Sequence, residues 1–368
     1  MAESGRGPLI PLFNELQHVS PRWCTLFLKI SPLLYPTFLG EVTCAPTPET
    51  LKLDHFLDED EDFHLPHTPL LKDLDIQLFI PLSSIYIDWS SLTTVVAEFR
   101  LMEEFFDVLR LAERLASFRL RLTGYQQCTR ISPFTHSALR ELYLDTDPKV
   151  PPEVVTMLNL ATFPSLEKFG YYSESSALFP NSAIPSIFNR SHYQLTHFDL
   201  CGDLQNGTPE DLISILSDLP TITHFKLQEE SESERLNDAL MSNMLLRRLT
   251  PIRPSEFTHT ERLLPRLESL EFLGYKGFSW SCLASFVSAV TLDRSPNLRT
   301  TPERPECTNS IRRISFKVYG EEELEHVDAQ SLIHFKAAHR AGIFRCQLLW
   351  VEFGGWVYDP FSGVDDLS

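Results

Sequence analysis

Residues 195–200 and 222–227 read Leu-Thr-His-Phe-Asp-Leu and Ile-Thr-His-Phe-Lys-Leu. Both stretches follow the pattern L-x-x-L-x-L, in which other apolar residues can occupy the three anchor positions. Side chains alternate between the two faces of a β-strand. The second and third anchors are therefore expected to point into a core, and the residues between them to point away from it.

The same pattern recurs along most of the chain. Successive first anchors lie 21 to 29 residues apart, apart from two intervals of 45 and 44 residues. Spacings of roughly 20–29 residues are typical of leucine-rich repeats. The anchors of the eleven repeats, the second of them weak because proline takes its first place, are Trp23/Leu26/Leu28, Pro48/Leu51/Leu53, Leu71/Leu74/Ile76, Leu92/Val95/Ala97, Leu115/Phe118/Leu120, Leu139/Leu142/Leu144, Leu166/Phe169/Tyr171, Leu195/Phe198/Leu200, Ile222/Phe225/Leu227, Leu267/Leu270/Phe272 and Ile311/Ile314/Phe316.

A recurrent proline fixes the phase of the repeat. Six of the eleven repeats carry proline two residues before the first anchor. Proline restricts the backbone of the turn that leads into a strand, and it donates no hydrogen bond there. These positions are Pro21, Pro46, Pro69, Pro164, Pro220 and Pro265.

Segments of helical period lie between the predicted strands. Thr208-Pro209-Glu210-Asp211 combines a capping residue, a first-turn proline and acids, and it predicts a helix. Further helices are expected over residues 101–114, after Ser279, and from Asp328 to Gly342, followed by a strand over residues 343–351. The sequence thus predicts an α/β leucine-rich-repeat solenoid (horseshoe) of about 11 repeats. A parallel β-sheet would form its concave face, and helices and loops its convex face.

The predicted solenoid spans residues 23–353. Residues 1–22 form an N-terminal segment and residues 354–368 a C-terminal tail. The two long intervals are expected to hold insertions or extra helices near residues 232–262 and 291–310. The acidic run Asp58–Asp62 is interpreted as a solvated loop, with a site for a cation or basic partner as the alternative.

Charge and composition limit the classes of function. A formal net charge of −18 disfavours nucleic acid and anionic membranes as partners. No signal peptide or long apolar run is seen, so we expect a cytoplasmic or nuclear protein, neither secreted nor in a membrane. A monomer is expected as a separate prediction. The seven cysteines contain no CxxC pair and are interpreted as reduced thiols: Cys24, Cys44, Cys128, Cys201, Cys282, Cys307 and Cys346.

The sequence favours neither an enzyme nor a cofactor-binding protein. No HExxH, GxxxxGK[ST], GxGxxG or GxSxG string occurs. Gly277-Phe278-Ser279-Trp280-Ser281 lacks the second glycine of a nucleophile elbow and fits a helix cap. His55, His64 and His67 fit no zinc spacing, so no metal is expected.

The predicted phase identifies candidate partner-binding residues on the concave face. Tyr143, Tyr172, His197 and His224 are aromatic groups with a polar tip, of the kind that interface hot spots favour. The alternative is that neighbouring side chains partly cover them. Arg119 and Arg121 could bind an acidic partner, or they could balance Glu98 and Glu141 on adjacent strands. The full candidate set is Arg119, Arg121, Glu141, Tyr143, Lys168, Tyr172, His197, Asp199, His224 and Lys226, and the same phase also points Gly170, Cys201 and Gln228 outward.

Val19-Ser20-Pro21-Arg22-Trp23, Leu246–Pro251 and Leu264–Phe272 resemble the leucine-rich-repeat region of fungal F-box proteins, especially those of mushrooms (basidiomycetes). The resemblance runs over nearly the whole chain through short motifs. It implies the substrate-recognition arm of a ubiquitin ligase receptor, in which an F-box docks on the Skp adaptor of a cullin complex. The target protein would lie on the concave face.

Two features depart from that family. Only 22 residues precede the first anchor, too few for a three-helix F-box, so Skp and cullin are expected as partners only if an F-box is supplied. The alternative is a free-standing repeat scaffold unrelated to ubiquitin. The asparagine that commonly follows the strand is also missing, so its backbone hydrogen bonds must be made in another way. Its places hold Thr123, Asp147, Asp203 and Glu230.

Overall fold

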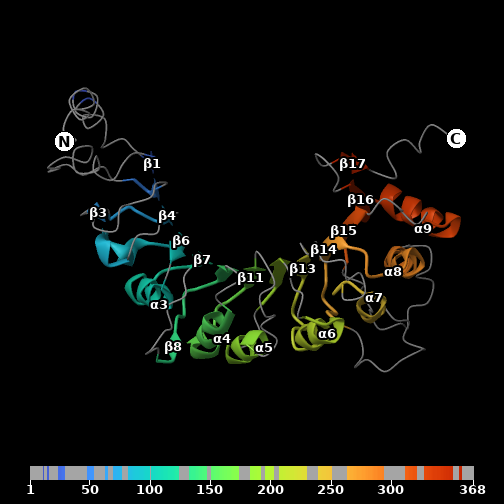
Figure 1. Ribbon diagram of the computed structural model, residues 1–368, viewed down its shortest axis with the longest axis horizontal. Coiled ribbons are helices and arrows are strands. Elements are labelled where there is room, and N and C mark those ends of the chain that lie inside the picture. Colours follow the sequence, from blue (N-terminus) through green and yellow to red (C-terminus); the bar gives the residue numbers. More distant parts are fainter. Residues whose placement is uncertain are drawn as a thin grey trace, which may run out of the picture. The chain divides into compact units, whose positions relative to one another are not determined.

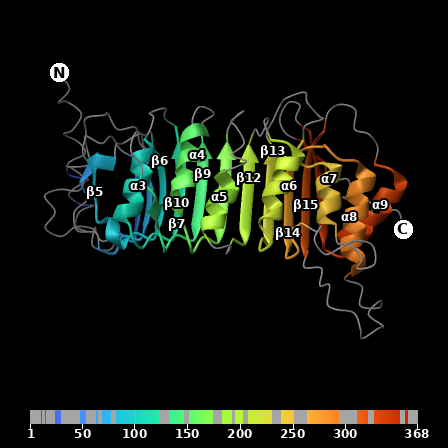
Figure 2. The same ribbon diagram turned by 90° about the horizontal axis from the view of Figure 1, so that it is seen from below.

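The chain divides into two compact units, residues 1–166 and 167–368. A computed structural model describes part of each unit, and Figures 1 and 2 show its elements. The described residues are 11, 15, 24–29, 48–53, 63–64, 69–76, 82–99, 101–123, 132–146, 151–173, 183–191, 195–202, 207–229, 239–250, 263–293, 311–320, 327–350 and 356–358.

The first unit is built on six parallel strands, each paired with the next in chain order. They are β1 (Thr25–Leu28), β2 (Thr50–Leu53), β4 (Asp73–Ile76), β6 (Thr94–Phe99), β7 (Ser117–Leu122) and β9 (Glu141–Thr146). Its helices are η3 (Leu82–Ser84), η4 (Trp89–Ser91), α3 (Met102–Leu111) and α4 (Pro151–Leu160). Two small parallel pairs join β3 (Phe63–His64) to β5 (Ile85–Tyr86), and β8 (Phe134–Thr135) to β10 (Ala161–Thr162).

The second unit repeats this plan. Its six parallel strands are β11 (Lys168–Ser173), β12 (His197–Gly202), β13 (His224–Glu229), β14 (Ser269–Tyr275), β15 (Arg313–Gly320) and β16 (Phe344–Trp350). A last strand, β17 (Trp356–Tyr358), pairs antiparallel with β16. The helices are α5 (Ala183–Arg190), α6 (Pro209–Ser217), α7 (Asn243–Leu249), α8 (Trp280–Asp293) and α9 (Ala329–Arg340). In each unit the helices lie on one face of the sheet (Figures 1 and 2).

All eleven predicted strands are present among the described residues, as is the strand predicted over residues 343–351. Burial alternates along them as the repeat predicts. In β9, Leu142, Leu144 and Thr146 are buried, whereas Glu141 and Tyr143 are partly exposed. An α/β chain with parallel strands and solenoid-like order is therefore established. We call the sheet face opposite the helices the outward face.

The predicted helix starts are also confirmed. Thr208 caps α6 by accepting a hydrogen bond from Asp211 N–H at 3.1 Å. Ser279 accepts from Cys282 N–H at 3.2 Å at the start of α8, and Asp328 accepts from Ser331 N–H at 2.8 Å at the start of α9. The capping role of Ser279 confirms the interpretation of residues 277–281 as a helix start. Helix α7 lies in the first long interval, where an extra helix was expected.

The backbone joins neighbouring repeats through one recurring arrangement. The carbonyl oxygen of Thr196 accepts hydrogen bonds from Thr223 N–H at 2.8 Å and from His224 N–H at 2.9 Å. The carbonyl of Thr223 accepts in the same way from Glu268 and Ser269 of the next repeat. Equivalent pairs of bonds recur along both units. Each repeat is thereby held in register with the one before it.

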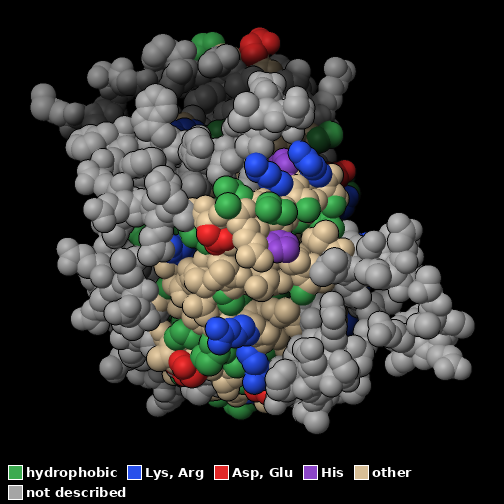
Figure 3. Space-filling view, turned by 90° about the vertical axis from the view of Figure 1, so that its right-hand side faces the viewer, with side chains coloured by type: hydrophobic (Ala, Val, Ile, Leu, Met, Phe, Trp, Pro, Cys, Tyr) green, Lys and Arg blue, Asp and Glu red, His purple; other side chains and the backbone are tan. Residues whose placement is uncertain are grey.

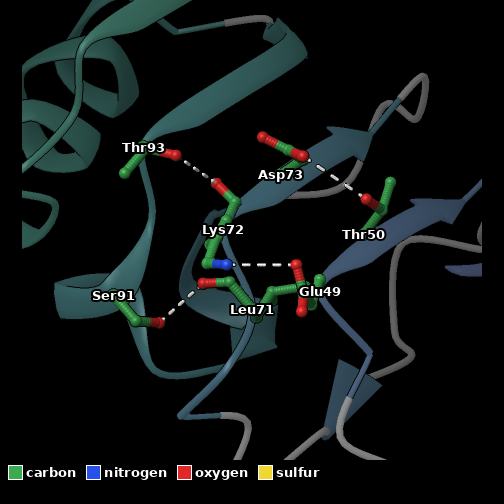
Figure 4. A network of polar contacts seen from close by, with 7 residues as sticks. All are labelled: Glu49, Thr50, Leu71, Lys72, Asp73, Ser91 and Thr93. Carbon is green, nitrogen blue, oxygen red and sulfur yellow. Dashed lines mark hydrogen bonds and ion pairs between the residues drawn. The ribbon is translucent and has the colours of Figure 1, made fainter. Parts of the chain in front are cut away.

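Side-chain hydroxyls at the entry to the strands also join neighbouring repeats, whereas of the places where asparagine was expected, Asp147, Asp203 and Glu230 lie outside the described residues. Ser91 Oγ donates to the carbonyl of Leu71 at 2.8 Å, and Thr93 Oγ1 donates to the carbonyl of Lys72 at 3.3 Å (Figure 4). In the same network Lys72 Nζ lies 3.0 Å from Glu49 Oε2. Serine and threonine hydroxyls of one repeat thus bond to the backbone of the preceding repeat.

A ladder of phenylalanine rings fills the core of the second unit. The rings of Phe169, Phe198 and Phe225 stack across three adjacent strands, with centroids 6.2 and 5.8 Å apart. Phe188 of α5 meets Phe169 edge-on at 5.4 Å. All four side chains are buried. The second anchor of the repeat therefore forms the floor of the core on which the helix packs.

Candidate functional site

The middle strands of the second unit bring six candidate residues together on the outward face. In β11, β12 and β13, Lys168, His197 and His224 lie side by side in register. The next outward row holds Asp199 beside Lys226, and Tyr172 lies at the end of β11. All six are partly exposed. The predicted phase is confirmed for these positions.

Two other positions predicted to point outward are buried. Gly170 is buried, and Cys201 is only 2% exposed. Cys201 lies in register between Tyr172 and Gln228, and its Sγ is 3.9 Å from Gln228 Oε1. The two larger side chains cover the small thiol. The prediction of an exposed Cys201 is therefore wrong, although its place in the register is as expected.

His197 and His224 form a stacked pair at the centre of this face. Their ring centroids lie 4.1 Å apart, and the rings are 4° from parallel. Thr196 Oγ1 lies 2.9 Å from His197 Nδ1, and Thr223 Oγ1 lies 2.9 Å from His224 Nδ1. Each imidazole is thus fixed by the threonine that precedes it.

The same two threonines also contact the backbone of the preceding repeat. Thr196 Oγ1 donates to the carbonyl of Glu167 at 3.1 Å, and Thr223 Oγ1 donates to the carbonyl of Thr196 at 3.1 Å. Each threonine oxygen thus lies between Nδ1 of the following histidine and a backbone carbonyl of the preceding repeat.

Opposite charges and a tyrosine surround the histidine pair. Tyr172 donates its hydroxyl proton to Asp199 Oδ2 at 3.3 Å. Lys226 lies directly between Asp199 of β12 and Glu271 of β14 in register. Charges of opposite sign on neighbouring strands attract each other modestly. This face therefore presents aromatic, acidic and basic groups in fixed rows.

The first unit carries the other four candidate residues on its own outward face. The guanidinium of Arg119 lies over the ring of Tyr143 at 5.2 Å from its centroid, a cation–π arrangement. Ser117 Oγ donates to Glu141 Oε2 at 3.3 Å. Arg121 lies in register between Glu98 and Asp145. Arg121 therefore has acids on both adjacent strands, in line with the alternative that the positive charge here is balanced locally.

The sequence analysis missed three buried charged or titratable side chains, Glu104, His136 and Glu229. Glu229 at the end of β13 accepts hydrogen bonds from Leu240 N–H at 2.6 Å and Met241 N–H at 3.4 Å, and burial raises its pKa to about 7. His136 accepts a hydrogen bond from Leu139 N–H through Nδ1, and burial lowers its pKa. Both of these last two side chains hydrogen-bond to loop backbone, and the alternating burial of β13 places Glu229 on the core side of its strand.

The part of the chain that the structure describes contains no group of three or more His, Cys, Asp or Glu placed to hold a metal ion. Within the same part, no helix has both the length and the apolar character that a membrane crossing requires. His55, His67 and the run Asp58–Asp62 lie outside the described residues, and of His64 only the backbone is described. No known protein family model and no curated protein matches this chain.

Proposed function

We propose that this chain is a non-enzymatic leucine-rich-repeat solenoid that binds a protein on the outward face of its sheet. The observation that carries this proposal is the central row of the second unit. There the stacked His197–His224 pair, Tyr172 and the Asp199–Lys226 neighbours are held on rigid strands and remain partly exposed. Aromatic and charged groups held in this way form hot spots at protein interfaces.

The repeat architecture supports the finer assignment to a leucine-rich-repeat horseshoe. The same pair of backbone hydrogen bonds recurs from repeat to repeat, and the anchors at a spacing of 21 to 29 residues fill the core. In such solenoids the sheet forms the concave surface, on which partners bind. The proposed binding function requires an accessible outward face and does not depend on how strongly the sheet curves.

Paired variants test this function. His224→Ala with Lys226→Ala removes two outward groups, whereas Glu210→Ala with Ser214→Ala removes two exposed groups of α6 on the helix side. We expect the outward variant to recover a native protein partner from cells at least about tenfold less well than the wild type, since a hot spot contributes about 2 kcal/mol or more. The helix variant should match the wild type. Equal recovery by all three proteins, with unchanged thermal unfolding, would contradict the proposal.

We further propose that the bound protein is the target of a ubiquitin ligase, with this chain as the recognition arm. The support for this step is the resemblance of residues 246–251 and 264–272 to fungal F-box proteins. Quantitative affinity capture should then recover the Skp adaptor and a cullin together with the target. Recovery of a partner through the outward face without Skp or cullin would favour a free-standing scaffold.

A further inference from the structure

Three cationic side chains lie on the outward face of β15 and β16. Arg313, Lys317 and Arg345 are all exposed. Their neighbours along the strands, Ile314 and Phe316 in β15, are buried in the core, so the three cations belong to the opposite face. Figure 3 looks onto the end of the second unit where α8 and α9 lie, and there Lys and Arg side chains stand in small separate groups.

The three cations differ from others on the same kind of face. In the first unit, Lys52 Nζ is 2.7 Å from Asp75 Oδ2 on the adjacent strand, and this pair neutralises itself. No hydrogen bond or ion pair joins Arg313, Lys317 or Arg345 to any group in the described part of the chain. Glu271 of β14 lies beside Ser315, diagonal to Arg313 and Lys317, so the three cations leave a net positive charge on this part of a protein whose net charge is −18.

The register spaces the three charges regularly. Arg345 lies beside Ser315, which is midway between Arg313 and Lys317 in β15. With a rise of about 3.3 Å per residue and about 4.8 Å between strands, Arg345 is about 8 Å from each of the other two backbone positions. Alternate residues of an extended peptide repeat at about 6.6 Å, so three alternate carboxylates can each approach one cation.

An aromatic pair continues the same row. Tyr319 lies two residues beyond Lys317, and its ring centroid is 5.1 Å from that of Tyr275 on β14. Leu273 lies directly opposite Lys317. Beyond Lys317, the row of cations is therefore followed by a partly exposed surface of Leu273, Tyr275 and Tyr319. One apolar or aromatic side chain of a partner can pack against it.

We propose that the outward face of β14–β16 binds an acidic, extended segment of the partner protein. Carboxylates at alternate positions lie on Arg313, Arg345 and Lys317, and the next side chain on the same face of the segment packs against Tyr275 and Tyr319. This inference rests on the proposed function and names the chemistry of its partner. A short acidic segment fits better than a long polyanion, because the protein as a whole repels extended negative charge.

The probe is a fluorescein-labelled peptide of sequence Gly-Glu-Thr-Glu-Thr-Glu-Thr-Tyr-Gly, which places three carboxylates and a tyrosine on one face when extended. Fluorescence anisotropy at about 0.05 M salt measures its dissociation constant, since screening there is weak. We expect Arg313→Gln, Lys317→Gln and Arg345→Gln together to weaken binding at least about tenfold, at two- to fivefold for each exposed charge contact. A peptide with Gln in place of each Glu should bind the wild type as weakly as the original peptide binds the triple variant.

Arg340→Gln is the matched control, because it removes one exposed cation at the end of α9 on the helix side. It should leave the dissociation constant unchanged within about twofold. Absence of peptide binding to the wild type, or equal binding by the wild type and the triple variant, would overturn the proposal. Tighter binding of a single-stranded oligonucleotide, lost in the triple variant, would also overturn it by assigning the patch to nucleic acid.

Failure of this inference can be separated from failure of the proposed function. If the triple variant still captures the native partner while His224→Ala with Lys226→Ala does not, the outward face binds a protein and only the acidic-segment assignment is wrong. If neither set of substitutions changes partner capture, the proposed function itself is wrong.

Discussion

Glu229→Gln is expected to remove a specific pH dependence from the stability of the protein. Because the carboxyl group is buried, its ionisation costs free energy of desolvation. The amide donors of Leu240 and Met241 offset only part of that cost. Its pKa in the folded protein is about 7, against 4.5 for the ordinary group. Between these values the folded state binds more protons than the unfolded state, so stability falls as pH rises.

The magnitude follows from the two pKa values. Each pH unit between 4.5 and 7 corresponds to about 1.4 kcal/mol, so Glu229 contributes about 3 kcal/mol that is present below pH 4.5 and lost above pH 7. Glutamine accepts the same amide hydrogen bonds without a charge. We therefore expect Glu229→Gln to match the wild type within about 1 kcal/mol at pH 5 and to exceed its stability by roughly 2–3 kcal/mol at pH 8.

Urea unfolding of both proteins from pH 5 to pH 8 measures this difference. The lowered pKa of buried His136 acts in the opposite sense, because its contribution to stability is lost as pH falls below about 6.5. That contribution is common to both proteins and cancels in the difference. Glu210→Gln, an exposed residue of α6, is the control and should leave the pH dependence unchanged. A free-energy difference that does not change with pH would refute the reasoning.

Three further stability predictions follow from the packing and the backbone, each measured by chemical denaturation. Phe198→Ala should cost about 3–5 kcal/mol, because it opens the centre of the ring ladder. Gly202→Ala should cost at least about 2 kcal/mol, because φ is +122° and a Cβ would lie 1.8 Å from the Ser173 carbonyl oxygen. Gly342→Ala is the comparison: its φ is +69°, but a Cβ there would meet open space, so the cost should be only about 1 kcal/mol. Thr208→Ala should cost about 1 kcal/mol by removing the cap of α6, and a cost below about 0.3 kcal/mol would contradict that role.

The strands could be predicted from sequence because their anchors report burial directly. A residue such as Phe198 is apolar at the position where every neighbouring repeat is apolar, so the local pattern and the shared core agree. Helices with a capping residue were found for the same reason. Helix α4 begins at Pro151-Pro152, and α5 contains Pro185 in its first turn, so both resemble loops in sequence. Strand β17 is too short to carry a periodic pattern.

Side chains whose surroundings come from distant segments could not be predicted. Glu229 lies at a position where the strand phase points inward, but its hydrogen-bond partners are amides eleven and twelve residues later in the chain. The space for its side chain exists because residue 274 of the next repeat is glycine, where a Cβ would lie 2.8 Å from Glu229 Cβ. Cys201 is buried because its two neighbours in register are large. For the candidate site, the sequence located His197 and His224, but their stacking needs the one-to-one register of β12 and β13.

The cations of β15 and β16 could be predicted only in part. The repeat phase alone assigns Arg313 and Lys317 to the outward face. That no acid lies directly opposite these cations among the described residues can be recognised only once the register places Ser269 and Leu273 beside Arg313 and Lys317, and Ser315 beside Arg345.

Residue-resolved crosslinking tests the central claim, that the outward face binds a protein, most directly. A photoreactive benzoylphenylalanine would replace His224 or Gln228 on the outward face, and Glu210 or Ser214 on the helix side, one at a time. We expect illumination in cells to attach the same partner protein from both outward positions and from neither helix position. Crosslinks to a common partner from the helix positions alone would contradict the claim.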